Sequence, residues 1–375
     1  MAPTQIAIVS SPSLEKWDWR APARGIGGSE TSHVKMAQGL KAAGFDIVSF
    51  APVPEAAVAD PSGLPWRDTS EFRAADFKVV IDYRDPALLR TEKPSGAKWW
   101  FVAQDVGYPW GAEIDTVDRY LALCPVHAKY TRDQFPELHK SGRLFISSNG
   151  IDSEGIRKTL EEFRQTGGKR NSKRLMYASS PDRGLMCLLE QWFRILERVS
   201  DAELHVFYGF HNMEKIVAMC GPGDWRADYQ RKLEILLKQP GVVWHDRVGQ
   251  KELWRNWAES NIWPYFCDFP ETNCITSMEA QACGAIPVTT NFWALRHTVA
   301  YGYKFDGLPQ KSAVVRQLMV EKVVELLRNS DETWDKWPGG DLPQRNWMMV
   351  DADKRFDWSN VVGQWSRWLE EDLKK

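Results

Sequence analysis

The chain has 375 residues, which is too long for one small core and suits two domains of ordinary size. Lys and Arg number 48 against 50 Asp and Glu, and 43% of the residues are hydrophobic, so the composition is that of a globular protein rather than a disordered or fibrous one. The formal net charge of −2 disfavours nucleic acid as a partner, without excluding it, because binding through bulk electrostatics needs a basic chain.

Targeting and cofactor signals are absent from the sequence. The N-terminal residues lack the basic start and long apolar run of a secretion signal, and no apolar run approaches the roughly 18 residues of a membrane span. We therefore expect a cytoplasmic protein without a transmembrane segment, and peripheral contact with a membrane stays open. The six Cys residues are scattered, which favours reduced thiols, and the seven His residues show no zinc-binding spacing, so we expect no zinc site.

Tryptophan is the compositional outlier, with 19 residues. Such large flat side chains either fill a core or stack on ligands such as sugars. Burial is the commoner of these two roles.

In the first part of the chain, short apolar runs alternate with helix-length segments, which is typical of βαβ units and parallel sheets. A helix is expected at residues 29–43, with Gly44 at its C-terminal end. Strands are predicted, in chain order, at residues 5–10, 45–50, 79–83, 98–103, 120–124 and 143–147. This pattern predicts a complete doubly wound domain over residues 1–152.

The same pattern starts again after a polar segment. Residues 153–172 include Gly167 and Gly168 and are predicted to be a linker. The second domain is predicted over residues 173–358, with strands at 174–178, 203–208, 242–245, 261–265 and 285–289 and helices at 184–199, 251–260 and 274–282.

The last segment, residues 359–375, has apolar residues at helical spacing and is predicted to be a helix that packs on its own domain or back on the first. The predicted fold class is α/β, with two tandem Rossmann-like domains that face each other across a cleft. Ligands of such sheets bind at the carboxyl ends of the strands.

The segment 269–290, FPETNCITSMEAQACGAIPVTT, carries the strongest chemical signal. Seven residues separate Glu271 from Glu279, and a helix is predicted to begin between them, so the step covers about 12 Å. That is comparable to the distance from a ribose to a sugar across a diphosphate. The amides of residues 273–275 at the positive end of the helix would favour an anion between the two carboxylates. The alternative is a helix with an acidic first turn and a solvated Glu.

This segment resembles the donor-binding signature of retaining glycosyltransferases of family 4, whose fold is called GT-B. In that family Pro-Glu opens the motif, a second Glu follows after seven residues, and Ala-x-Ala-x-Gly-x-Pro-Val runs into the next strand. Residues 279–284 (EAQACG) and Pro287-Val288 match this pattern. Residues 272–274 (TNC) replace the usual Gly-Phe-Gly, as in the branch with Glu-Thr-Asn-Cys-Ile. Further matches follow in order along nearly the whole chain.

The resemblance implies a site for a nucleotide-diphosphate sugar. Glu271 would hold sugar hydroxyls, Glu279 the ribose, and Arg183, together with the amides at the helix start, the diphosphate. Many relatives carry a further Arg where this chain has Ser179, so Arg183 would act alone. The resemblance further implies contacts with the donor from Gly27 and Gly28 of a glycine-rich loop and from Ser179, Ser180, Arg247, Val248, Thr272, Asn273, Cys274 and Ile275.

The first domain is expected to hold the acceptor. Gln104 replaces a His that relatives often place there, and Asp105 keeps the acid that follows it in some of them. Asp105 would orient a sugar hydroxyl or balance charge near the anomeric carbon, and capping of a helix or loop is the alternative. Tyr108 and Trp110 are candidates for stacking on the acceptor, although such side chains are more often core.

We therefore predict a retaining hexosyl- or pentosyltransferase that moves a sugar from a nucleotide-diphosphate sugar to an acceptor hydroxyl. The resemblance implies a front-face substitution without a protein nucleophile, a metal or another cofactor. The expected acceptor is a glycan or a lipid-linked glycan, and a modified DNA base is the less favoured hypothesis. The alternatives are a sugar phosphorylase or nucleotide-sugar epimerase of the same fold, and a relative that binds a glycan or nucleotide without turnover.

Overall fold

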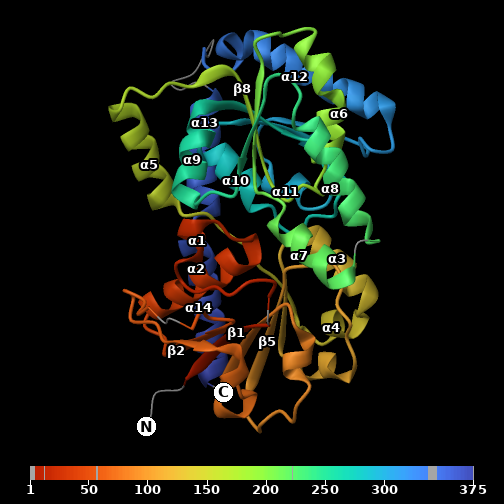
Figure 1. Ribbon diagram of the computed structural model, residues 1–375. Coiled ribbons are helices and arrows are strands. Elements are labelled where there is room, and N and C mark those ends of the chain that lie inside the picture. The colour runs from red at the N-terminus through yellow and green to blue at the C-terminus, as the bar shows by residue number, and fades with distance from the viewer. Residues whose placement is uncertain (1–4, 12, 56–57, 222, 337–343, 375) are drawn as a thin grey trace.

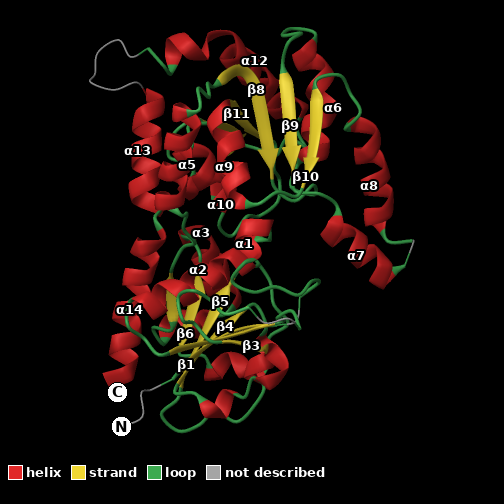
Figure 2. Ribbon diagram, turned by 60° about the vertical axis from the view of Figure 1, so that its left-hand side comes forward, coloured by secondary structure: helices red, strands yellow, loops and turns green. Residues whose placement is uncertain are grey.

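The computed structural model describes residues 5–11, 13–55, 58–221, 223–336 and 344–374. They form two α/β domains, each built around one parallel sheet, and Figures 1 and 2 show the two domains stacked end to end. The predicted fold class of two Rossmann-like domains is thus confirmed. None of the described helices combines the length and the apolar character needed to cross a bilayer.

The first sheet has seven strands in the order β3-β2-β1-β4-β5-β6-β7, all parallel to their neighbours. The strands are β1 (Ile6–Ser10), β2 (Ile47–Ala51), β3 (Trp66–Asp68), β4 (Val79–Tyr83), β5 (Lys98–Ala103), β6 (Arg119–Ala122) and β7 (Leu144–Ile146). The helices of this half are α1 (Ala21–Arg24), α2 (Gly28–Ala42), α3 (Pro125–Gln134) and α4 (Pro136–Lys140), with 3₁₀ turns at Thr69–Glu71, Ala74–Asp76, Pro86–Leu89 and Ala112–Thr116.

The second sheet has six parallel strands in the order β10-β9-β8-β11-β12-β13. They are β8 (Asn171–Ala178), β9 (Glu203–Phe207), β10 (Val242–Asp246), β11 (Ser260–Tyr265), β12 (Ile286–Thr290) and β13 (Tyr303–Phe305). The helices of this half are α5 (Ser153–Gln165), α6 (Leu185–Leu196), α7 (His211–Cys220), α8 (Trp225–Leu236), α9 (Gln250–Glu259), α10 (Ile275–Ala282), α11 (Leu295–Thr298), α12 (Ala313–Thr333) and α13 (Gln344–Phe356), and the chain ends in α14 (Trp358–Lys374), which packs on the first domain.

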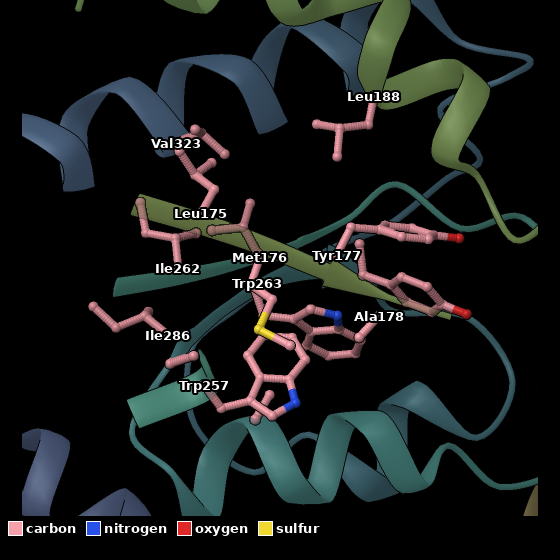
Figure 3. Close-up of a cluster of buried hydrophobic side chains, with 14 of the residues drawn as sticks. Leu175, Met176, Tyr177, Ala178, Leu188, Trp257, Ile262, Trp263, Ile286 and Val323 are labelled. Atoms are coloured by element: carbon pink, nitrogen blue, oxygen red, sulfur yellow. The ribbon is translucent and has the colours of Figure 1, made fainter. Parts of the chain in front are cut away.

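The central strands are buried on both faces, as helix-covered parallel strands must be. In the core of the second domain, Leu188 of α6 and Val323 of α12 lie on one side of β8, and Trp257 of α9 lies on the other (Figure 3). The abundance of tryptophan is largely explained by such cores. Fully buried indoles belong to Trp99, Trp100, Trp192, Trp257, Trp263, Trp334 and Trp365.

The polar segment predicted to be a linker is mostly helical. Residues 153–165 form α5, which packs against α9 and buries Ile156 and Leu160. The side chain of Asp152 caps this helix by accepting a 2.8 Å hydrogen bond from the amide of Gly155. The many charged residues around the buried positions hid this amphipathic pattern.

The C-terminal helix α14 packs on the first domain. It follows α13, which contacts α10 of the second domain, and it runs down beside the first sheet (Figure 1). Trp365 and Leu369 of α14 are buried in one cluster with Ile8 of β1. The chain passes between the domains twice, near Ile151 and near Phe356, and these two segments lie side by side. The amide of Ile151 donates a 2.7 Å hydrogen bond to the carbonyl of Phe356.

Candidate functional site

A cleft of about 1370 Å³ opens between the two domains. It lies at the carboxyl ends of strands from both sheets, the usual place for a ligand in such folds: Ser10 and Tyr83 line it from the first sheet, and Ala178 and Phe207 from the second. Every residue that the sequence predicted for the site lines this cleft except Trp110.

The two aromatic candidates for acceptor stacking lie differently. The ring of Trp110 packs against Phe101, with centroids 4.5 Å apart, and against Tyr120 at 5.9 Å. This places Trp110 with the core of the first domain rather than in the cleft lining. Tyr108 packs edge-on against Phe101 at 4.8 Å and also reaches the cleft.

Glu271 follows β11 and is fixed at one oxygen. The hydroxyl of Tyr265 donates a 2.6 Å hydrogen bond to its Oε1, and Nε of Arg183 lies 4.0 Å from the same oxygen. Burial raises the pKa of Glu271, and the neighbouring guanidinium of Arg183 acts in the opposite direction. The other oxygen, Oε2, has no hydrogen-bond partner among the described residues, so it is available to a ligand.

Arg183 lies in the turn between β8 and α6. Its amide donates a 2.9 Å hydrogen bond to the carbonyl of Ser180, and its Nη1 lies 3.0 Å from a carboxylate oxygen of Asp182. The guanidinium packs on the ring of Phe269, 3.1 Å from the ring centroid. These contacts hold the cation at the cleft wall next to Glu271.

Helix α10 begins at the cleft wall. Within the described residues, no hydrogen-bond acceptor pairs with the backbone N–H groups of residues 273–276, which lie in and before its first turn and line the cleft. Unpaired amides at a helix N-terminus attract anions. The start of α10 and Arg183 therefore both present positive charge to the cleft beside Glu271.

Two side chains before α10 bridge the domains. The hydroxyl of Thr272 donates a 2.7 Å hydrogen bond to the carbonyl of Gln104, and the Nδ2 of Asn273 donates a 2.9 Å bond to the carbonyl of Leu123. The sequence predicted donor contacts for both residues. In the structure the Thr272 hydroxyl and the Nδ2 of Asn273 are engaged with the first domain, whereas Oδ1 of Asn273 is buried without a described partner.

Glu279 lies on α10 and is 3% exposed. The indole Nε1 of Trp254 donates a 2.8 Å hydrogen bond to its Oε1. Burial raises the pKa of Glu279 to about 7. No described residue hydrogen-bonds to its Oε2, and the residue lines the cleft.

The glycine-rich loop meets the second domain at the rim of the cleft. Gly25 has a φ of 87°, and a Cβ there would collide with the carbonyl oxygen of Val248. A Cβ on Gly249 would collide with the carbonyl of Ala23 in the same way. Arg247, which was predicted to contact the donor, pairs across this rim with Glu15 at 2.8 Å.

Arg84 is a residue of the site that the sequence did not single out. It follows β4 with a φ of 75°, and its Nε donates a 2.7 Å hydrogen bond to Oδ2 of Asp105. Its Nη1 lies 3.8 Å from a carboxylate oxygen of Glu30. No sequence pattern marks Arg84, because its role arises from the packing of β4 beside β5.

In the described parts of the chain, no group of three or more His, Cys, Asp and Glu is arranged to hold a metal ion.

Two Rossmann-like domains with a cleft between the carboxyl ends of their sheets form a GT-B fold. Comparisons with models of protein families and with curated proteins gave no match. Solved structures do match, over nearly the whole chain.

Three of these structures illustrate the likeness. AviGT4, a glycosyltransferase involved in avilamycin A biosynthesis, has a TM-score of 0.62 and 14% identity, covering 99% of this chain and 98% of that one. Sucrose-phosphate synthase from Thermosynechococcus elongatus has a TM-score of 0.69 and 12% identity, covering 99% of both chains. Anabaena HepE in complex with UDP-glucose has a TM-score of 0.65 and 12% identity, covering 98% and 99%. At such identities the likeness shows the fold.

Proposed function

We propose that this protein is a retaining glycosyltransferase of family 4 that moves a sugar from a nucleotide-diphosphate sugar to an acceptor hydroxyl without a bound metal. The observation that carries the proposal is the convergence in one cleft of Arg183, the unpaired amides at the start of α10, and the carboxyl groups of Glu271 and Glu279. HepE, which shares the fold, binds UDP-glucose, and this supports a donor of the same class.

The donor is proposed to lie along the second-domain wall. Its diphosphate would face Arg183 and the amides of residues 273–276, where a helix N-terminus and a guanidinium both favour negative charge. The free Oε2 atoms of Glu271 and Glu279 would accept hydrogen bonds from the sugar and the ribose hydroxyls. The glycine-rich loop, already in contact with Val248, would cover the phosphates.

The proposed step breaks the bond between the anomeric carbon and the diphosphate oxygen and forms a bond to the acceptor oxygen on the same face of the sugar. The leaving phosphate oxygen takes the acceptor proton, so no protein nucleophile is needed. Arg183 and the helix-start amides stabilise the charge that grows on the leaving diphosphate. Asp105, across the cleft, would balance positive charge at the anomeric carbon.

A thermal-shift panel of UDP, GDP, ADP and CMP with their sugars, each with and without EDTA, tests the donor site. A ligand at a hundred times its Kd adds about 2.7 kcal/mol to the free energy of unfolding, which raises the midpoint by a few degrees. We expect one nucleotide to stabilise the protein equally with and without EDTA. Loss of the shift in EDTA would contradict metal independence.

The reaction itself needs a second measurement. With the donor identified, NMR of the product gives the anomeric configuration, which we expect to equal that of the donor sugar. Inversion would overturn the retaining mechanism. Sugar release that depends on inorganic phosphate would instead indicate a phosphorylase.

A further inference from the structure

The two walls of the cleft differ in charge. Among the described lining residues, the first domain contributes three carboxylates (Glu15, Glu30 and Asp105) and one cation (Arg84), whereas the second contributes four cations (Arg183, Lys215, Arg226 and Arg247) and three acidic residues (Asp182, Glu271 and Glu279). The half of the cleft opposite the proposed donor site is therefore acidic.

The single cation of the first-domain wall is already neutralised. Arg84 donates to Asp105 at 2.7 Å and lies 3.8 Å from Glu30, so two carboxylates share one guanidinium. Glu15 is paired with Arg247 at 2.8 Å. What remains on this wall is an excess of one negative charge beside Arg84.

The same wall offers uncharged hydrogen-bonding groups. The Nε1 of Trp17 has no partner among the described residues, although the side chain is 2% exposed and lines the cleft. A buried donor of this kind needs an acceptor oxygen, which an ordered water or a ligand can supply. Ser10 also lines the cleft, and its hydroxyl is bonded at 2.7 Å to Nδ1 of His33. This His is neutral because burial lowers its pKa to about 3.

We infer that the first-domain half of the cleft accepts an uncharged or amine-bearing sugar and disfavours an acceptor that carries phosphate or carboxylate. The inference rests on the proposed glycosyl transfer and narrows its acceptor. Among the described residues that line this wall, an anionic group beside Glu30 and Asp105 would find no unpaired cation. Hydroxyl groups would find donors and acceptors, and an ammonium group would meet the excess negative charge.

Matched acceptors test this preference. Glucose, glucosamine and glucose 6-phosphate share one ring, and the galactose and mannose series repeat the comparison. Each is offered with the identified donor at about pH 6.5, where a free amine is mostly protonated. The readout is the release of nucleoside diphosphate above the rate without acceptor. We expect kcat/KM for the phosphorylated sugar to be on the order of tenfold below that of the neutral one.

Two isosteric variants test whether the charge of the first-domain wall causes the preference against phosphorylated acceptors. Glu30→Gln removes the excess charge, so the penalty for the phosphorylated acceptor should shrink, whereas Glu71→Gln, an exposed carboxylate outside the cleft lining, should leave it unchanged. A phosphorylated acceptor that is used best, a penalty unaltered in Glu30→Gln, or donor hydrolysis without transfer to any of the sugars would overturn the inference. Absence of any donor turnover would instead contradict the proposed function.

Discussion

The indole Nε1 of Trp254 on α9 donates a 2.8 Å hydrogen bond to Oε1 of Glu279 on α10. This bond fixes one carboxyl oxygen of a nearly fully buried side chain and leaves the other without a described partner. Burial raises the pKa of Glu279 to about 7, because the charged form loses more solvation than the neutral form, while the Trp254 bond acts in the opposite direction. The carboxyl group therefore titrates near neutral pH.

The first prediction concerns stability against pH. The folded state holds the proton of Glu279 up to about pH 7, whereas an unfolded Glu releases it near 4.5. The free energy of unfolding therefore falls as the pH rises from about 4.5 to 7, by up to roughly 3 kcal/mol from this group. We expect Glu279→Gln to remove this fall. Chemical denaturation at two pH values on either side of the window measures it.

A matched control separates this effect from general charge effects. Glu190 is exposed on α6, and Glu190→Gln should keep the pH dependence of the wild type. If Glu279→Gln loses as much stability across the window as the wild type does, the raised pKa is not the cause.

The second prediction concerns nucleotide affinity. A ribose hydroxyl bonds more strongly to an ionised carboxylate than to a neutral amide, so Glu279→Gln should weaken nucleotide binding by about tenfold above pH 7. Below the pKa of Glu279 the difference should become smaller, because the wild-type group is then neutral as well. Titration calorimetry at both pH values provides the test. Equal affinities of variant and wild type above pH 7 would remove the ribose role.

The third prediction concerns Arg183. Its guanidinium lies 4.0 Å from Glu271 and lines the same cleft as the unpaired amides of α10, so Arg183→Ala should lower the transfer rate by about a hundredfold or more. Arg183→Lys keeps the positive charge but loses the planar set of guanidinium donors, so its transfer rate should lie between those of the wild type and Arg183→Ala. Arg194→Ala, at an exposed position of α6, is the control and should retain the wild-type rate. A rate for Arg183→Ala close to that of Arg194→Ala would show that the diphosphate is stabilised elsewhere.

The fourth prediction concerns the contact between the domains at the rim. A Cβ on Gly249 would collide with the carbonyl of Ala23, so Gly249→Ala should hold the cleft open while each domain keeps its core. We expect slower transfer and a larger radius of gyration in solution scattering with donor present. A Cβ on Gly223 meets nothing, so Gly223→Ala should behave as wild type. A closed, fully active Gly249→Ala would show that this contact is dispensable.

The central strands were predictable because each is a continuous apolar run with turns on either side. The strands β4 and β5 were predicted with their observed bounds. The edge strands β3 and β13 were not predicted, because each has a charged residue between its aromatic or polar neighbours and lacks the continuous apolar run of the equally short β7. Helix α5 was taken for a linker because its composition is polar and its stability comes from packing on α9.

Of the candidate site, the sequence alone could predict the residues that lie together in one continuous motif. Glu271 and Glu279 were singled out because their spacing and the residues around them form a recognisable motif, and both line the cleft. Trp254 and Arg84 were not found, because their partners are distant in sequence and only the packing of neighbouring elements brings them together. The bridging roles of side chains just before α10 were missed for the same reason.

The last prediction concerns the attachment of α14 to the first domain. Asp372 and Arg119 form an ion pair at 2.9 Å in which each side chain is 6% exposed, and the indole of Trp100 donates to the same carboxylate at 2.8 Å. Asp372→Asn keeps the shape but leaves the guanidinium buried without its main counter-charge, so the free energy of unfolding should fall by about 3–5 kcal/mol. Glu371 contacts the same guanidinium from a side chain that is 58% exposed, and Glu371→Gln should therefore cost under about 1 kcal/mol. Denaturant unfolding of both variants measures the difference. Equal costs would mean that the buried pair contributes no more than its exposed neighbour to holding α14 on the first sheet.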